Sequence, residues 1–399
     1  MLKITKISAS VLIFYVLFYL QVWGDNHIIL YGTAVISVAS MLIYCFEQGK
    51  LDLSNVPFGI WNNLMMVVYC LITGFFVSYN YSATISGCIT YAAFSFVCIA
   101  ICYASSEEGS FDWVIRILIA LAIIDATYTL FRGYDLSGYG RVLSSTNNPH
   151  TLAAVMNLGI FSVVFIRRNK ERVTSLLSIL LIFYFFYTII ECGSRKYLLA
   201  SSCLVVLFFA AFFKERWTNQ DNQQKIILIV ISILFFFLSV YLFRKVYSQS
   251  YTYLRMEDMD NSGNQKRIMY YRQAWDIFLD HPFFGGGYDQ FRYLTDGSYA
   301  HSTYAEAISD FGFVGCLLYF IPIINTSYQI IYKAFITEKK YSTILLAALC
   351  ISELFLGVGQ IFFMEFYHFL AWTILFFYSE TTDVNKYETY SNCKYIRNF

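Results

Sequence analysis

Charged residues are scarce in this sequence, and the deficit excludes a soluble protein. Only 14% of the 399 residues are charged and 58% are hydrophobic, whereas soluble domains carry about 25% charged residues. The mean hydropathy is +0.53. We therefore expect a polytopic membrane protein. The net charge of +1 also lacks the positive excess of nucleic-acid-binding proteins, so no nucleic-acid partner is expected.

Three further absences narrow the kind of membrane protein that is expected. The chain has no internal repeat and no low-complexity linker, and no small-residue cleavage site follows its apolar N-terminus. An uncleaved first helix is therefore expected. The ten cysteines mostly lie inside apolar runs, without metal-ligand spacing. This pattern indicates small apolar side chains in lipid rather than a disulfide framework or a metal site.

Long apolar runs are what the chain does have. A membrane-spanning helix needs about 20 mostly apolar residues, and twelve runs approach that length. They cover residues 7–23, 28–46, 60–79, 83–104, 112–131, 150–166, 173–190, 197–213, 226–243, 306–332, 342–363 and 366–379. The prediction is an all-α protein with about 12 transmembrane helices in a single membrane-embedded domain, residues 1–399. One long connection, residues 244–305, interrupts the series.

The distribution of basic residues predicts the orientation. The segments on the N-terminal side of the membrane carry 16 lysines and arginines, whereas the short loops on the other side carry four: Arg132, Arg141, Arg195 and Lys196. Short cytoplasmic loops carry the excess of positive charge in membrane proteins. Both termini are therefore predicted to be cytoplasmic, and the loop 244–305 extracytoplasmic.

The long loop contains a predicted amphipathic helix at about residues 264–280. Its apolar positions follow a 3- and 4-residue spacing: Ile268, Tyr271, Trp275 and Phe278. We expect this helix to lie along the outer membrane surface with its apolar face inward. The glycine run 285–287 follows, and it fits either a plain turn or a nest of amides for an anion.

Several basic residues lie on the side that the orientation rule leaves poor in positive charge. Arg141 and Arg195 occupy short outer loops, and Arg267 and Arg272 flank the amphipathic helix. Each is either a snorkelling anchor or a ligand of a phosphate, for which the guanidinium fork is well shaped. His301, at the start of a span, is either structural or a proton acceptor.

Two short segments resemble parts of the O-antigen polymerase and O-antigen ligase superfamily of bacterial envelope glycosyltransferases. RVLSSTNNPHTLA resembles the family's Arg…Asn-Pro-x-x-Leu-Ala segment, whose arginine corresponds to Arg141. GSRKYLLA resembles its Ser-Arg segment, whose arginine corresponds to Arg195.

Two further segments extend the resemblance. RIMYYRQAWDIFLDHPFFGGG is similar to the family's Arg-x-x-x-Trp…His-Pro-x-x-Gly-x-Gly block, with the arginine at Arg267 and Tyr271 in place of the tryptophan. AHSTYAEAISDFGFVG is similar to its Ala-His-Asn-x-Tyr…Gly-x-x-Gly block, with His301 as the histidine and Ser302 in place of the asparagine. The order of the four segments makes the set fairly specific.

The resemblance implies a glycosyltransferase C-like fold and a function. The donor is a sugar chain linked through pyrophosphate to undecaprenol, and no metal and no cofactor take part. Arg141, Arg195, Arg267 and Arg272 are then the candidate ligands of the pyrophosphate, and His301 is the candidate general base for the acceptor hydroxyl. Polymerisation of repeat units at the outer face of the cytoplasmic membrane is the expected reaction, with a chain-length regulator as a candidate partner.

Two alternatives remain. Within the superfamily, an O-antigen ligase transfers finished polymer to a lipid A core instead of another repeat unit. From a different class, a lipid-linked oligosaccharide flippase has a similar size and number of spans. Transporters place ionisable residues inside their spans, and Asp125 and Glu353 are the main candidates of that kind here.

Overall fold

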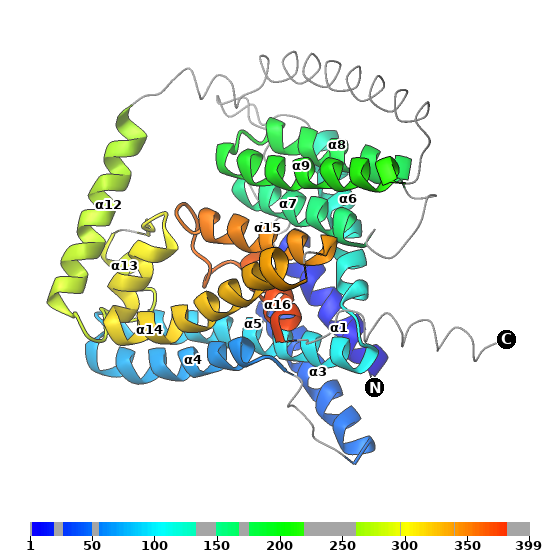
Figure 1. Cartoon of the computed structure of the whole chain (residues 1–399). Helices are drawn as coiled ribbons and strands as arrows, with labels where there is room; N and C mark the ends of the chain where they lie inside the picture. The colour runs from blue at the N-terminus through cyan, green and yellow to red at the C-terminus, as the bar shows by residue number, and fades with distance from the viewer. Residues whose placement is uncertain are drawn as a thin grey trace. The chain divides into compact units, whose positions relative to one another are not determined.

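The computed structural model describes residues 2–19, 27–49, 56–132, 149–166, 175–218, 261–295, 297–338 and 340–380, and every regular element in these ranges is helical. The helices are α1 (Leu2–Phe14), η1 (Tyr15–Tyr19), α3 (His27–Glu47), α4 (Phe58–Val77), α5 (Tyr81–Glu108), α6 (Asp112–Arg132), α7 (Pro149–Ile166), α8 (Ser175–Glu191), α9 (Arg195–Thr218), α12 (Asn261–Asp280), α13 (Gln290–Leu294), α14 (Thr303–Tyr332), η3 (Lys333–Thr337), α15 (Tyr341–Leu356) and α16 (Phe366–Glu380). Figure 1 shows them along the chain.

Six helices in the described ranges have the length and apolar composition to cross a membrane. They are Ile28–Glu47, Phe58–Val77, Tyr81–Glu108, Asp112–Phe131, Pro149–Ile166 and Thr303–Thr337. Shorter apolar helices accompany them at Leu177–Glu191 and Tyr341–Leu356. The chain is therefore a polytopic integral membrane protein, as its composition predicts. The expected run 226–243 lies outside the described residues.

One predicted span is wrong at its C-terminal end. The apolar run 342–363 was expected to be one helix, but α15 ends at Leu356 and residues 357–365 form turns. The reason is a set of contacts with the start of α14: Thr303 donates from its amide to the Gly357 carbonyl (2.8 Å) and from its hydroxyl to the Gln360 carbonyl (2.6 Å). These bonds replace the helical ones that residues 357–360 would otherwise form.

By their internal contacts the helices form two compact units. Unit 1 comprises Met1–Val114 and Asn261–Phe399, and unit 2 comprises Ile115–Asp260. In unit 1 the long helix α14 packs against α4, α12, α15 and α16, and Figure 1 shows α12 beside it. The loop that carries His301 leads directly into α14, so these helices position it.

Helix α12 has two different apolar faces. Ala274 and Ile277 are buried and pack with Phe291 and Ala300 of the following segment. The predicted stripe lies on another face, where the Trp275 side chain is 51% exposed. The protein core therefore uses one face of α12 and leaves Ile268, Tyr271 and Trp275 of the predicted stripe exposed.

Helix α14 is broken at Gly312, and the glycine run repairs the break. Gly312 has φ 62° and ψ −168° inside the helix. The amides of Gly286 and Gly287 donate to the carbonyls of Ser309 (2.7 Å) and Asp310 (3.1 Å), and the amides of Phe313 and Val314 donate to the carbonyls of residues 282 and 283 (2.9 and 3.0 Å). Backbone groups released by the break are thus satisfied within the protein, as a membrane interior demands.

This pairing decides between the two readings of the glycine run. The Gly285 amide also donates to a backbone carbonyl, that of His281 (2.8 Å). All three glycine amides are therefore engaged in the docked loop, and the anion nest is the wrong reading. The run is a turn whose chief requirement is close approach between two backbones.

Substituting either glycine at the contact is expected to destabilise the protein strongly. A Cβ at Gly285 would lie 2.4 Å from the Asp310 carbonyl oxygen, and one at Gly312 would lie 2.3 Å from the Gly285 nitrogen. Both residues also have positive φ. We expect Gly285→Ala and Gly312→Ala each to lower the free energy of unfolding by about 3 kcal/mol or more, measured as a drop in the apparent Tm of the detergent-purified protein.

Gly297 supplies the matched control. Its φ is +83°, but a Cβ there would meet nothing within 4 Å. Gly297→Ala therefore carries the backbone strain alone, about 1 kcal/mol. Equal drops in the apparent Tm for Gly285→Ala, Gly312→Ala and Gly297→Ala would mean that glycine is needed for its positive φ and not for the close contact.

In unit 2 the helix α7 is the most buried element. Every residue from Thr151 to Phe165 is buried, and α7 packs against both α8 and α9. Gly159 permits close packing against α6 and α8, because a Cβ there would lie 2.6 Å from the Ala122 side chain and 3.1 Å from the Phe185 ring. The turn between α8 and α9, which carries Ser194, is thereby held beside the start of α7.

Candidate active site

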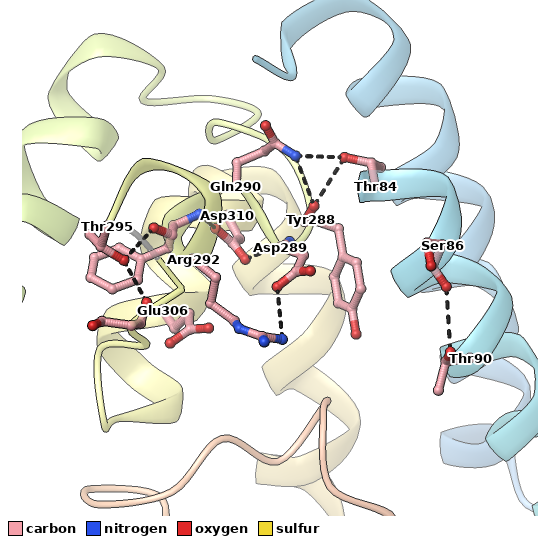
Figure 2. Close-up of polar contacts among 12 residues, drawn as sticks. Thr84, Ser86, Thr90, Tyr288, Asp289, Gln290, Arg292, Thr295, Glu306 and Asp310 are labelled. Atoms are coloured by element: carbon pink, nitrogen blue, oxygen red, sulfur yellow. Dashed lines mark hydrogen bonds and ion pairs between the residues drawn. The ribbon is translucent and has the colours of Figure 1, made fainter. Parts of the chain in front are cut away.

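The segment before His301 is organised by a buried carboxylate. Asp310 of α14 accepts the amide of Asp289 on Oδ2 (2.9 Å) and the amide of Phe291 on Oδ1 (3.0 Å), which fixes the start of α13 (Figure 2). A carboxylate is well suited to the free amides at a helix N-terminus. Asp310 is itself almost completely buried, so it joins α13 firmly to α14.

Gln290 joins the same turn to α5. Its Nε2 donates to the Asn80 carbonyl (3.0 Å) and to the Thr84 hydroxyl (3.1 Å), and its Oε1 accepts the Asn80 amide (2.8 Å). Figure 2 shows the side chain pointing to Thr84. The turn at residues 289–291 is therefore anchored to both α14 and α5.

His301 has an unusual backbone conformation that its neighbours hold. Its φ is 57°, in the left-handed region that costs a residue with a side chain about 1 kcal/mol or more. On one side, Glu306 Oε2 accepts the amide of Ala300 (2.7 Å). On the other, Ser302 caps α14 by accepting the Ala305 amide (3.4 Å), and Thr303 accepts the Phe362 amide (3.0 Å). The direction of the imidazole is therefore imposed by the fold.

Two tyrosines flank the imidazole of His301. The ring centroid of Tyr299 lies 4.2 Å from that of His301, and the centroid of Tyr270, from α12, lies 6.2 Å away. His301 is half-buried between them. An imidazole placed in this way keeps a fixed orientation while one side stays accessible.

Charges of both signs act on Tyr299. Burial raises the pKa of the Tyr299 phenol, Glu365 and Glu306 raise it further, and Arg292 and Arg267 lower it. Tyr299 therefore remains a neutral hydrogen-bond donor near pH 7. Nearby, burial raises the pKa of Asp289 while Arg292, at 3.4 Å, lowers it; Figure 2 shows this ion pair.

The four predicted arginines have different places. Arg267 is exposed on α12 and acts electrostatically on Tyr299, beside His301. Arg272 is also exposed but lies on the other face of α12, where it lines a hollow with Ile268 and Trp275. Arg195 is the exposed first residue of α9 in unit 2. Arg141 lies outside the described residues.

Three of the other four histidines have polar partners in the described residues. His150 Nδ1 lies 3.0 Å from the Ser194 hydroxyl in unit 2. His281 Nε2 lies 3.4 Å from the Tyr79 hydroxyl. His368 is fully buried, with Nδ1 2.5 Å from Glu353 Oε2. His301 differs from these three in its left-handed backbone and its position between an arginine-bearing helix and the start of α14.

Sequence reasoning missed several residues that build this site. Tyr270, Tyr299, Glu306 and Asp310 were not singled out. One signal existed for Tyr270, which lies three residues after Arg267 on a helix and so shares its face. Glu306 and Asp310 bind backbone amides 6 and 21 residues away, and the sequence carries no periodic signal for such contacts.

These features define a class of protein: a polytopic membrane protein with a histidine held just before a membrane-length helix and an exposed arginine, Arg267, on a helix that packs against it. Residues 179–320 match the O-antigen ligase family. The match confirms the resemblance over three of the four motif segments, those of Arg195, Arg267 and His301, whereas the segment with Arg141 lies outside the matched residues. No curated protein sequence matches the chain.

The match indicates a general activity. It points to a membrane glycosyl-transfer enzyme of polysaccharide assembly that acts on lipid-linked glycans. The choice between polymerase and ligase lies beyond this assignment.

Proposed function

We propose that the protein polymerises undecaprenyl-pyrophosphate-linked oligosaccharide repeat units into O-antigen, capsular polysaccharide or exopolysaccharide. The reaction takes place at the outer face of the cytoplasmic membrane. The excess of basic residues on the side of both termini supports this orientation. The observation that carries the proposal is His301, held just before a membrane-length helix and against Tyr299, on which Arg267 acts electrostatically.

The chemistry is a single displacement. The acceptor hydroxyl gives its proton to the neutral imidazole of His301, and its oxygen attacks the anomeric carbon of the donor. The bond between that carbon and the pyrophosphate oxygen breaks, and undecaprenyl pyrophosphate leaves with the electron pair. Attack from the opposite side inverts the anomeric centre. No metal is needed where guanidinium groups stabilise the leaving group.

Arginines are suited to the negative charge that develops on the pyrophosphate. Arg141, Arg195, Arg267 and Arg272 are the proposed ligands, and each remains protonated at any pH at which the enzyme works. Charge that appears only as the bond breaks is stabilised more in the transition state than in the ground state, which speeds the reaction.

A polymerase is preferred to a ligase because the sequence has no additional basic patch for a phosphorylated lipid A core. The alternative from another class is a flippase of lipid-linked oligosaccharides. The buried pair of Glu353 and His368, between α15 and α16, favours it, since ionisable residues inside membrane bundles are common on transport pathways.

Deletion of the gene distinguishes the three functions. We expect single repeat units capped on the lipid carrier, facing outward, and their conversion to polymer when the wild-type gene is restored. Long polymer left on the carrier would instead show a ligase. Repeat units retained on the cytoplasmic side would show a flippase. The lipid-linked fraction is analysed by size, and its orientation by labelling of the sugars in intact cells.

A further inference from the structure

Unit 2 brings together two segments that lie 44 residues apart in the sequence. His150 is the second residue of α7, and Ser194 ends the turn that precedes α9. Nδ1 of His150 lies 3.0 Å from the Ser194 hydroxyl. Ser194 is buried, whereas the next residue, Arg195, is exposed. The imidazole therefore holds Ser194, the residue directly before Arg195.

A second hydrogen bond fixes the register of the two helices. The Ser201 hydroxyl donates to Asn157 Oδ1 at 2.7 Å, and both residues are buried. Asn157 follows His150 by seven residues, and Ser201 follows Ser194 by the same number. Helices α7 and α9 therefore run parallel, and they begin at the same end, where the bond between His150 and Ser194 lies (Figure 1).

We propose that His150 is a positioning residue for Arg195. A guanidinium fork binds a pyrophosphate through two oxygens only if its direction is fixed to about 10–20°, and the first residue of a helix takes its direction from the turn before it. By holding Ser194, His150 fixes that turn. This inference rests on the proposed function, in which Arg195 binds the pyrophosphate of the lipid-linked donor.

The hydrogen bond is available in both protonation states of the imidazole, because the serine hydroxyl donates as well as accepts. His150 therefore needs no contact with substrate to act. Without the His150 imidazole, the turn is no longer held in one conformation. The guanidinium of Arg195 then points less often in the direction that binds the pyrophosphate.

The test measures binding of undecaprenyl pyrophosphate to the full-length protein in lipid nanodiscs, with undecaprenol as the probe that lacks the pyrophosphate. We expect His150→Ala and Ser194→Ala each to raise the Kd for undecaprenyl pyrophosphate about 10-fold, which corresponds to about 1.4 kcal/mol. The double variant should bind undecaprenyl pyrophosphate no more weakly than either single variant, since both substitutions remove the same hydrogen bond. His150→Asn, which keeps a polar group near the place of Nδ1, should recover most of the affinity. Binding of undecaprenol should not change.

Ser201→Ala is the matched control. It removes a buried hydrogen bond between the same two helices, seven residues from Ser194. It should lower the apparent Tm as much as Ser194→Ala does, while leaving the Kd as in the parent. An equal rise in Kd for Ser201→Ala would overturn the inference, because the bonds would then serve only helix packing.

Arg195→Ala separates the failure of this inference from the failure of the proposed function. If Arg195→Ala binds undecaprenyl pyrophosphate like the parent, Arg195 is not a pyrophosphate ligand and both proposals fail at this residue. If Arg195→Ala weakens binding but His150→Ala and Ser194→Ala do not, Arg195 keeps its role and only the positioning role of His150 is wrong.

Discussion

The His301→Ala enzyme is expected to bind lipid-linked donor like the parent and to turn over roughly 100-fold to 10,000-fold more slowly, the range that general-base catalysis contributes. The acceptor hydroxyl has a pKa far above 7, so without a base its proton stays in place during attack. The measurement uses purified protein and lipid-linked repeat units extracted from the deletion strain, with products resolved by size. Donor binding is measured separately.

The backbone at His301 demands a second variant. Because φ is 57° there, alanine loses the base and also strains the loop. Asparagine accepts left-handed backbone more readily but takes up no proton. Loss of turnover in both His301→Ala and His301→Asn identifies the base, whereas recovery in His301→Asn alone would mean that only the loop conformation matters.

The pH profile gives an independent check. An imidazole accepts a proton only when neutral, and the ordinary pKa of histidine is about 6.5. Turnover should therefore be full above about pH 7 and fall below about pH 6, while EDTA should leave it unchanged. Parental turnover in His301→Ala would place the base elsewhere. His150 and His281 would be tested next, before His368, which is fully buried against Glu353.

Lysine substitutions at the arginines are expected to have the second-largest effect. Arg141→Lys, Arg195→Lys and Arg267→Lys each keep the positive charge but lose the two-pronged hydrogen bonding of the guanidinium. We expect turnover to fall about 10-fold or more, with normal insertion into the membrane. Unlike His301→Ala, these variants should also bind donor more weakly.

Arg272 provides an internal comparison for Arg267. Both are exposed on α12, but Arg267 acts on Tyr299 beside His301, whereas Arg272 lies with Trp275 on the other face. We expect the smaller loss from Arg272→Lys. Equal losses would show that both faces of α12 meet the donor. Parental activity in every lysine variant would reduce these arginines to membrane anchors.

Composition alone determined the class of this protein, because apolar runs of about 20 residues form helices in a bilayer whatever surrounds them. Helix α12 was also predictable, because its amphipathic spacing is a local pattern in the sequence. The short motifs identified the family, and its match over residues 179–320 confirms that resemblance. The roles of His301, Arg195 and Arg267 stay predictions.

Tertiary structure decided what distant segments do to each other. The amides of Gly286 and Gly287 repair the break in α14 at Gly312 and so are unavailable to an anion. The apolar run after Leu356 leaves the helix because Thr303 of α14 takes up its carbonyls.

The same holds for the polar contacts of the site. The helical period fixes the angle between Arg267 and Arg272, but only the packing of Ala274 and Ile277 decides which face of α12 turns toward His301. His150 and Ser194 meet across 44 residues, a contact that no local pattern encodes. Helix formation depends on residues three and four apart, whereas partners in a buried polar network are chosen by the fold.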